Sequence, residues 1–303
     1  MRGWGATSSA CTACYAAKEQ GRNRVQVFSQ DDYAMVQRHG EMLWVPRIQE
    51  ALSSDRFVLF YQPIVPLAGG LEQHGEILLR MRDRDGKLVM SSAFIPSAER
   101  YKQMQDIDRW VIRQSFRNLA LWHELSAEPL SLSINVSVQS LSDEGFLSFV
   151  ERELTESKVP LDSVCFEITE TAVVSNLTHA KQFFTRLKSR GARFALDDFG
   201  SGLSSFSYLK NLPVDYLKID GSFVKDMATD PIDRAMVEAI HRVGNVMGLE
   251  TIAEFVEDHE IAQKLTEIGV NYGQGYGLGK PRPLAELYAG GPLLDASASR
   301  LAL

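Results

Sequence analysis

Hydrophobic and polar positions recur at two different spacings along the chain from residue 57 onward. Short runs of β-branched and other apolar residues are typical of buried strands, and longer segments with apolar residues every three or four positions are typical of amphipathic helices. Strand-like runs occur at Val58–Val65, Gly75–Arg82, Leu130–Ser137, Val164–Thr169, Arg193–Phe199, Tyr216–Asp220, Leu249–Phe255 and Asn271–Tyr276. Helical segments lie between them at Asp106–Leu125, Ser140–Glu156, Thr178–Arg190, Pro231–Met247 and Asp258–Ile268. This alternation predicts an α/β fold whose eight strands close into a barrel.

The first two runs differ from the others. Only residues 66–74 separate them, which leaves no room for a crossover helix, so we expect an antiparallel hairpin. Glu76 would then begin the second strand of the hairpin, beside the end of the first strand, and would reach the rim at which the other strands end. The predicted fold class is a modified TIM (β/α)8 barrel with one antiparallel strand.

Composition limits the class of protein. Of 303 residues, 45% are hydrophobic, and no apolar run reaches the length of a membrane span, so the sequence predicts a cytoplasmic protein without membrane contact. The net charge of −7 disfavours binding to a DNA or RNA duplex, because that binding needs Lys and Arg to neutralise phosphates. Cys11 and Cys14 form a C-x-x-C pair without further cysteine or histidine partners nearby, which disfavours a zinc site or a disulfide.

Polar side chains stand at the ends of the apolar runs, where a buried strand gives them no reason to be. They are Glu76, Asn135, Glu167, Asp197, Asp198, Lys218, Asp220, Glu254 and Gln274. Taken singly, each has a structural explanation, such as a turn cap at Asn135 or an ion pair between Lys218 and Asp220. Taken together they do not, because burying several carboxylates at one barrel mouth without cations would cost on the order of several kcal/mol each.

Metal ions would supply the missing positive charge. Carboxylate and amide oxygens favour Mg²⁺ or Mn²⁺ over zinc, since no cysteine or paired histidine joins the set. The adjacent Asp197 and Asp198 suit two metals about 3.5–4 Å apart, as in two-metal phosphoryl hydrolysis. Lys218 would be placed to hold or deprotonate the attacking water.

These residues give the chain a resemblance to a known family. Glu76-Ile77-Leu78-Leu79-Arg80 resembles the signature of the EAL-domain family of cyclic di-GMP phosphodiesterases, and the resemblance extends over roughly residues 48–287. Further matching motifs are Tyr61-Gln62-Pro63, Asn135-Val136-Ser137, Glu167-Ile168-Thr169-Glu170, Asp197-Asp198-Phe199-Gly200-Ser201-Gly202, Lys218-Ile219-Asp220, Glu254-Phe255-Val256-Glu257 and Gly273-Gln274-Gly275-Tyr276. The resemblance implies that cyclic di-GMP is hydrolysed to linear pGpG in bacterial signalling. It also implies two Mg²⁺ or Mn²⁺ ions per site, with Ca²⁺ inhibitory because of its longer and looser bonds.

The resemblance implies a role for each matching residue. The ligands of one metal would be Glu76, Asn135, Glu167 and Asp197, and those of the second would be Asp197, Asp198 and Glu254. Lys218 would orient the water, which makes Lys218, Glu254, Asp197 and Asp198 the catalytic set. The substrate-binding set would be Gln62, Arg80, Asp220, Glu257, Gln274 and Tyr276. Glu170 would anchor the loop that follows Asp198, and a homodimer is expected near this loop, where Phe206 and Tyr208 add aromatic surface.

Three residues depart from the family pattern. Ile77 replaces alanine in the signature, but its side chain should alternate away from the Glu76 face. Phe255 replaces a glycine between Glu254 and Glu257, where it would narrow the pocket or fill it. Leu203 stands where the loop often has an aromatic residue.

The N-terminal segment carries a second resemblance. Residues 13–25 resemble the closing helix and strand of a GGDEF diguanylate cyclase domain, with a generic amphipathic helix as the alternative. We therefore expect a remnant of a preceding GGDEF-like domain at residues 1–30 and a linker helix at 31–52. The EAL phosphodiesterase barrel would span 53–290 and a C-terminal tail 291–303.

Two other functions remain open at this point. A catalytically weak or silent cyclic di-GMP receptor would keep the nucleotide site and signal through its dimer. An unrelated metal-dependent barrel, such as an enolase-type lyase, would abstract a proton from carbon and would space its ligands differently. The retention of every expected ligand favours the hydrolase.

Overall fold

The computed structural model describes residues 41–70, 73–200 and 206–289. Within it the chain forms two compact units. Of the described residues, the first unit holds 41–57 and 81–104, and the second holds the rest. The expected remnant at 1–30, the linker helix before residue 41 and the tail at 291–303 lie outside the described residues, as does Leu203.

The first unit is small and is held together by aromatic side chains. Its elements are α3 (Trp44–Ser53), β3 (Leu88–Met90) and α4 (Ser91–Arg100). The rings of Trp44 and Phe57 lie 6.3 and 5.8 Å from the ring of Phe94 on α4. Helix α3 coincides with the end of the helix expected before residue 53. The short β3 was not predicted, because three residues are too few to show a period.

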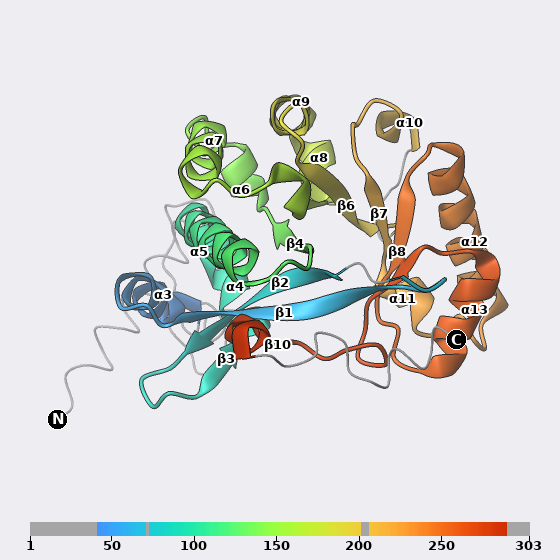
Figure 1. Ribbon diagram of the computed structural model, residues 1–303, viewed down its shortest axis with the longest axis horizontal. Helices are drawn as coiled ribbons and strands as arrows, with labels where there is room; N and C mark the ends of the chain where they lie inside the picture. The colour runs from blue at the N-terminus through green and yellow to red at the C-terminus, as the bar shows by residue number, and fades with distance from the viewer. Residues whose placement is uncertain (1–40, 71–72, 201–205, 290–303) are drawn as a thin grey trace, which may run out of the picture. The chain divides into compact units, whose positions relative to one another are not determined.

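The second unit contains the expected α/β barrel (Figure 1). The barrel strands are β1 (Phe57–Pro66), β2 (Gln73–Arg82), β4 (Leu130–Asn135), β5 (Val164–Thr169), β6 (Arg193–Phe199), β7 (Tyr216–Ile219), β8 (Glu250–Ala253) and β9 (Tyr272–Gly273), with β10 (Arg282–Pro283) added to β1. Of these strands, Phe57 of β1 and Met81 and Arg82 of β2 belong to the first unit. The sheet closes because β1 pairs with both β9 and β2. Strand β1 is antiparallel to β9, whereas the other seven run parallel from β2 and β4 round to β9. The predicted barrel with one antiparallel strand is confirmed.

The explanation expected for Glu76 was wrong in one respect. The antiparallel strand is β1, and β2 runs parallel to β4 with Glu76 opposite Ser133. Glu76 is therefore not the start of a reversed strand. Strand β2 runs from Gln73 to Arg82, so Glu76 lies within its length, and its carboxylate reaches the side chain of Asn135 at the end of β4.

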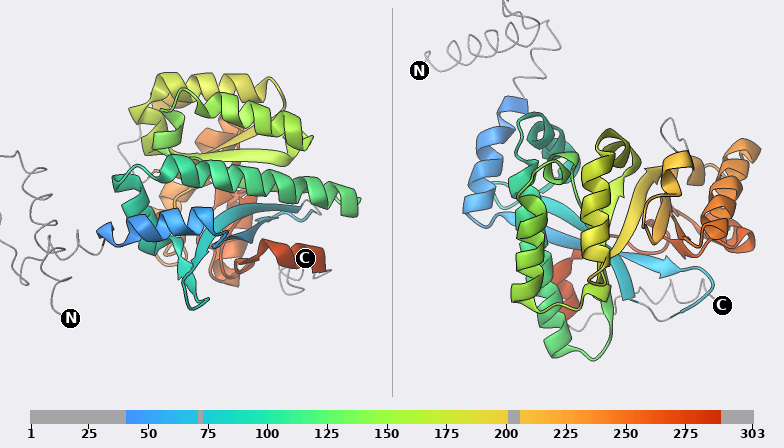
Figure 2. Two further views of the ribbon diagram at one scale, coloured as in Figure 1. Left: turned by 90° about the vertical axis from the view of Figure 1, so that its left-hand side faces the viewer. Right: turned by 90° about the horizontal axis from the view of Figure 1, so that it is seen from above.

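Helices cover the outside of the barrel. They are α5 (Met104–Leu125), α6 (Val138–Leu141), α7 (Phe146–Ser157), α8 (Glu170–Ser175), α9 (Leu177–Lys188), α10 (Phe206–Leu209), α11 (Gly221–Val224), α12 (Pro231–Val246) and α13 (His259–Ile268), with the 3-10 turns Leu161–Ser163 and Leu284–Ala289. Figures 1 and 2 show α5, α7 and α9 side by side. Beneath α9, Phe184 packs against Phe194 of β6 with 4.6 Å between ring centroids. This aromatic packing fixes the layer of helices on the sheet.

One predicted helix is divided in two. The segment expected as a single helix at Ser140–Glu156 forms α6 and α7 with a turn between them. The carboxylate of Asp143 in this turn accepts a hydrogen bond from the backbone N–H of Gly145, 2.9 Å away. Such local side-chain acceptors compete with helical hydrogen bonds, which explains the break.

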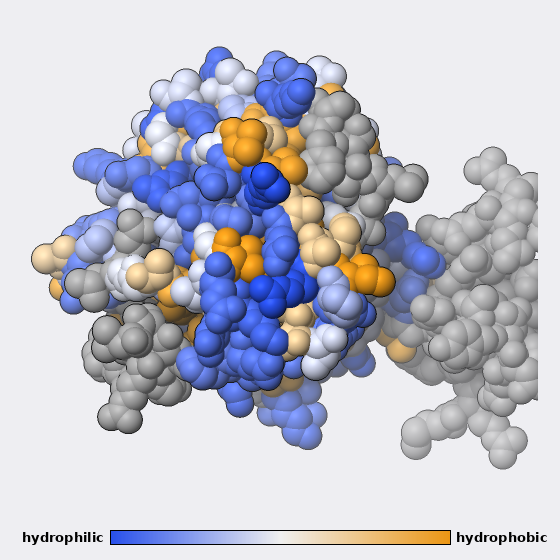
Figure 3. All heavy atoms as spheres, turned by 90° about the vertical axis from the view of Figure 1, so that its right-hand side faces the viewer, coloured by the Kyte–Doolittle hydropathy of each residue, from blue (hydrophilic) through white to orange (hydrophobic). Residues whose placement is uncertain are grey.

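The face over α12 and α13 is mostly hydrophilic, with small separate hydrophobic groups (Figure 3). Helix α12 follows the amphipathic pattern, with Val237 and Ile240 buried and Ile232 and Val246 exposed. No described helix combines the length and the apolar character that crossing a bilayer requires.

Candidate active site

Two successive layers of side chains fill the barrel, because every second strand residue points inward. The inner layer consists of Ile64, His74, Ser133, Cys165, Ala195, Tyr216, Ile252 and Tyr272, which meet in a cluster, in ring contacts or in a hydrogen bond. The rim layer lies two residues after the inner-layer residue on each parallel strand, and two residues before it on the antiparallel β1. Its members are Gln62, Glu76, Asn135, Glu167, Asp197, Lys218, Glu254 and Gln274.

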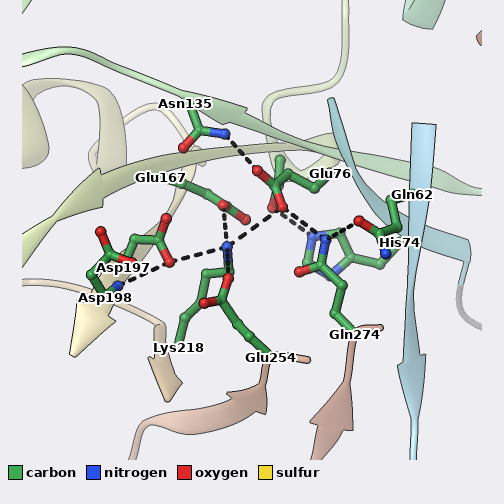
Figure 4. Close-up of polar contacts among 11 residues, drawn as sticks. Gln62, His74, Glu76, Asn135, Glu167, Asp197, Asp198, Lys218, Glu254 and Gln274 are labelled. Carbon is green, nitrogen blue, oxygen red and sulfur yellow. Dashed lines mark hydrogen bonds and ion pairs between the residues drawn. The ribbon is translucent and has the colours of Figure 1, made fainter. Parts of the chain in front are cut away.

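Lys218 is the centre of the rim layer (Figure 4). Its ammonium nitrogen lies 2.7 Å from Glu167 Oε2, 2.8 Å from Glu254 Oε1, 3.1 Å from Asp197 Oδ1 and 3.6 Å from Glu76 Oε2. The lysine is almost completely buried. Strands β2, β5, β6 and β7 and the residue after β8 thus bring four carboxylates to one cation.

Amide side chains complete the ring around Glu76. The Nδ2 of Asn135 donates to Glu76 Oε1 at 2.6 Å, and the Nε2 of Gln274 donates to Glu76 Oε2 at 2.8 Å. Gln274 also lies 3.4 Å from Oε1 of Gln62. These bonds hold the Glu76 carboxylate at a fixed orientation toward Lys218.

A bulge in β6 brings two neighbouring aspartates to the same site. The register with β7 shifts between Leu196 and Phe199, and Asp198 has a positive φ of 55°. In a regular strand, Asp197 and Asp198 would point to opposite faces, and the bulge removes this alternation. Carboxylate oxygens of Asp197, Asp198 and Glu254 accordingly lie within 4.8 Å of one another, close enough to hold a metal ion.

Burial shifts the proton affinities of this cluster. It raises the pKa of Glu167 and of Glu254 to about 8, against the attraction of Lys218 and with help from nearby carboxylates. Burial, followed by the Asp197 and Asp220 charges, also raises the pKa of Asp198. For Lys218, burial alone would lower the pKa, but the surrounding carboxylates raise it well above its ordinary value. One ammonium therefore does not stabilise all the carboxylates in their ionised form.

Two buried oxygens point to a further cation. Oε1 of Glu167 and Oε1 of Gln274 have no hydrogen-bond partner within the described part of the chain. A buried acceptor without a partner is costly, and a carboxylate oxygen in this state is a ready metal ligand. The chemistry of the donors, carboxylates and amides without sulfur, suits divalent cations that prefer oxygen.

A cavity of 350 Å³ opens beside the rim layer. The predicted substrate-binding residues Gln62, Arg80, Glu257, Gln274 and Tyr276 line it, together with Glu76 and Glu254. The guanidinium of Arg80 lies 5.5 Å from the ring centroid of Phe60 and donates to the carbonyl of Leu79. Residues expected to bind the substrate and residues expected to bind metal thus line the same cavity.

The comparison with known proteins agrees with this geometry. Residues 46–281, more than three quarters of the chain, match the family model described as "EAL domain". The chain belongs to the EAL domain family.

This EAL domain is similar to proteins named as cyclic di-GMP phosphodiesterases. "Cyclic di-GMP phosphodiesterase PdeB" of Shewanella oneidensis is 42% identical over 90% of this chain, and "Cyclic di-GMP phosphodiesterase PdeA" of Borreliella burgdorferi is 37% identical over 78%. The match covers 32% and 35% of these relatives, so the chain spans about a third of their length.

Two solved structures share the fold of this EAL domain. The structure "PaMucR Phosphodiesterase, c-di-GMP complex" has a TM-score of 0.77 at 31% identity, covering 81% of this chain and 99% of the other. The FimX EAL domain from Pseudomonas aeruginosa bound to c-di-GMP has a TM-score of 0.73 at 31% identity, covering 78% and 96%.

Two predicted residues of the EAL domain lie apart from the Lys218 cluster. Asp220 caps helix α11, with its Oδ1 accepting from the N–H of Ser222 at 2.7 Å, and it does not line the cavity. Glu170 accepts from the hydroxyl of Tyr208 at 2.7 Å and from the N–H of Gly200 at 3.3 Å. Its carboxylate therefore contacts one residue before and one residue after positions 201–205 in the chain. Gly200 has a φ of +101°, which favours glycine at this position.

Sequence reasoning missed Asp108, which supports the site from outside. Asp108 lies on α5 and is almost completely buried, and its carboxylate accepts from the N–H of Ser137 at 2.9 Å. This bond fixes the turn just after Asn135. The available signal was an aspartate among the apolar residues of an amphipathic helix, next to the buried Ile107 and near Val111.

Sequence reasoning also missed Leu78 and Pro281, which line the cavity. Leu78 follows Glu76 by two positions, so strand alternation offered a signal for it. No local pattern marked Pro281.

Proposed function

We propose that this EAL domain is a divalent-metal-dependent phosphodiesterase that hydrolyses cyclic di-GMP to linear pGpG. The observation that carries the proposal is the convergence of four buried carboxylates on Lys218, directly beside a cavity lined by Arg80. The names of the relatives and of the complexed structures support the choice of nucleotide.

The metal ligands follow from the two groups of carboxylates. We assign Glu76, Asn135, Glu167 and Asp197 to one cation, with the unpartnered Glu167 Oε1 as its most direct support. Asp197, Asp198 and Glu254 would hold the second, so Asp197 would be a ligand of both. Mg²⁺ or Mn²⁺ fits this oxygen-only set, and when bound it would acidify a water molecule and stabilise charge on the phosphate oxygens.

Lys218 would hold the attacking water and balance charge. Its pKa is raised well above the ordinary value by the surrounding carboxylates, against the effect of burial. A protonated ammonium donates hydrogen bonds and does not remove protons, so between the two roles expected for Lys218 we assign orientation of the water. This makes Lys218 a catalytic residue whose loss should spare nucleotide binding.

The cavity would hold the nucleotide. Arg80 is placed to pair with phosphate oxygens, and Gln62, Glu257 and Tyr276 offer polar groups and one aromatic ring to the base or ribose. Gln274 would act by fixing Glu76 and Asp220 by shaping the start of α11. Glu170 would anchor the loop after Asp198 through Gly200 and Tyr208.

Further features of the parent protein also stay proposals. They are the cytoplasmic location, a homodimer near α10, a preceding GGDEF-like domain, and division into a remnant at 1–30, a linker helix at 31–52, a barrel at 53–290 and a tail at 291–303. A relative named "Bifunctional diguanylate cyclase/cyclic di-GMP phosphodiesterase MucR" from Pseudomonas aeruginosa, 32% identical over 93% of this chain, supports the GGDEF-like neighbour. The hydroxyl of Tyr208, one of the two aromatic residues expected near the dimer contact, donates to Glu170 of the same chain.

The experiment is chromatographic detection of pGpG from cyclic di-GMP with wild-type protein under Mg²⁺, Mn²⁺ and Ca²⁺. We expect pGpG with Mg²⁺ or Mn²⁺ and little with Ca²⁺, whose longer bonds and higher coordination number do not suit the site. Lys218→Ala should lower kcat by about 10²–10⁴-fold while retaining nucleotide binding. The exposed Lys225→Ala is the matched control and should behave as wild type.

Tight binding by wild-type protein without pGpG under any metal would contradict hydrolysis. It would instead support the receptor function. Absence of both binding and turnover would reject cyclic di-GMP as the ligand.

A further inference from the structure

Phe255 has a backbone conformation that phenylalanine rarely adopts. Non-glycine residues with positive φ in the described chain are Asp55, Lys102, Lys158, Asp198 and Phe255. The first three lie just after the helices α3, α4 and α7, where left-handed residues commonly end a helix. Asp198 lies in the bulge of β6, where its carboxylate is close to those of Asp197 and Glu254. Phe255, with a φ of 54°, has neither explanation, and strained residues of this kind concentrate at functional sites.

Burial does not explain the phenylalanine either. The residue is 58% exposed, so most of its apolar surface gains nothing from the hydrophobic effect in the free protein. It lines the same cavity as Arg80, Glu257 and Tyr276, and it directly follows Glu254 in the chain. An exposed ring in a strained backbone at this place is suited to contact a ligand.

The ring is held in position from one side by Gly221. A Cβ atom added to Gly221 would lie 2.1 Å from Cδ2 and 2.6 Å from Cγ of Phe255. The ring therefore rests directly on the backbone at the start of α11, and only glycine leaves room for it there. Because one side of the ring is fixed, the surface that it presents to the cavity is preorganised, which lowers the entropy cost of a contact.

We propose that Phe255 is a substrate-binding residue whose ring stacks against a planar purine base of the nucleotide in the cavity. This inference rests on the proposed function and adds a residue that holds a base of the bound nucleotide. Aromatic rings stack on nucleobases with an energy that corresponds to about tenfold or more in affinity. Because Phe255 directly follows Glu254 in the chain, a base stacked on its ring would lie close to the proposed metal ligands.

The test uses the full chain with Mg²⁺ and measures the Kd of the product pGpG by calorimetry, together with kcat and KM for cyclic di-GMP. Phe255→Leu keeps an apolar side chain and should raise Kd and KM about tenfold while kcat stays within about twofold. Phe255→Tyr keeps the ring and should restore wild-type values. The affinity for Mn²⁺ alone should be the same in all three proteins, because no metal ligand changes.

Further variants separate stacking from a structural role. Phe255→Gly should raise Tm, since glycine tolerates the positive φ, yet weaken pGpG binding. Gly221→Ala should displace the ring of Phe255 and weaken pGpG binding when Phe255 is present. In a Phe255→Ala protein, the same substitution should cause no further loss of pGpG affinity. Ile232→Ala, an exposed apolar residue on α12 outside the cavity, is the matched control and should leave both measurements unchanged.

Two results would overturn the inference in distinguishable ways. If wild type binds pGpG and Phe255→Leu binds it equally well with an unchanged KM, then Phe255 does not stack and the proposed function stands. If wild type neither binds pGpG nor hydrolyses cyclic di-GMP, then the proposed function fails and this inference fails with it.

Discussion

The inner and rim layers of the barrel are built on the same strands two residues apart, yet they have opposite character. In the inner layer, burial, followed by the charges of Arg193 and Lys218, lowers the pKa of His74 to about 3, so the ring is neutral and its Nε2 lies 2.9 Å from the hydroxyl of Ser133. In the rim layer, four carboxylates surround Lys218, and Glu167 has an oxygen without a partner.

The difference separates residues that pack the barrel core from residues that we propose to act in catalysis. Polar groups in the inner layer are few and are paired, as expected of a core. The rim layer collects more negative charge than its one lysine balances, which costs stability unless further cations bind. Under the proposed function the rim layer binds those cations, so changes in the two layers should have different consequences.

The largest effect is expected from removing one charge in the rim layer. Asp197→Asn keeps the size of the side chain but removes the charge proposed to bridge both metals. We expect kcat to fall by about 10³-fold or more and Mn²⁺ affinity to fall with it. Steady-state kinetics and calorimetric titration with Mn²⁺ would measure both changes.

The control for that change lies in the inner layer of a neighbouring strand. Cys165→Ala, two residues before Glu167 on β5, should cost about 1–2 kcal/mol of unfolding free energy and leave kcat within about twofold. Near-normal Mn²⁺ binding by Asp197→Asn would contradict the proposed metal-binding role of the rim layer. Loss of activity in a folded Cys165→Ala protein would contradict a purely structural role for the inner layer.

A smaller effect concerns the pH dependence of stability in the inner layer. In the unfolded chain His74 binds a proton below about pH 6.5, whereas the folded protein excludes that proton until about pH 3. The unfolded state therefore binds more protons between these values, and stability falls as the pH falls through this window. His74→Gln removes this contribution and should make the loss of stability between pH 7 and pH 5 about 2 kcal/mol smaller than in wild type.

Urea unfolding of the metal-free proteins at pH 7 and pH 5 would measure the difference. Equal losses of stability in wild type and His74→Gln would mean that His74 is already charged in the folded protein. The inner layer would then not be neutral.

Strand alternation explains why so much of the site could be predicted. Glu167, Lys218 and Glu254 stand at or just beyond the ends of apolar runs, and parallel strands of a barrel end at one rim, so pattern and topology together place them near one another. The fold class followed from the same alternation of strands and helices.

Features set by tertiary contacts could not be predicted in this way. The positive φ of Asp198 depends on a register shift between β6 and β7, which no local sequence signal specifies. The position of Phe255 depends on its contact with Gly221, more than thirty positions earlier in the chain. The break between α6 and α7 depended on a side-chain acceptor at Asp143 within an otherwise helical pattern.

We expect the rim layer to bind two divalent cations, and anomalous diffraction would locate them. Crystals of the wild-type protein grown with Mn²⁺ and pGpG would be measured at the manganese absorption edge. We expect two anomalous peaks about 3.5–4 Å apart, one on each side of the Asp197 carboxylate, with one of them in contact with Oε1 of Glu167. Absence of any peak among Glu76, Glu167, Asp197 and Glu254 at saturating Mn²⁺, with Lys218 still the only cation among them, would contradict it.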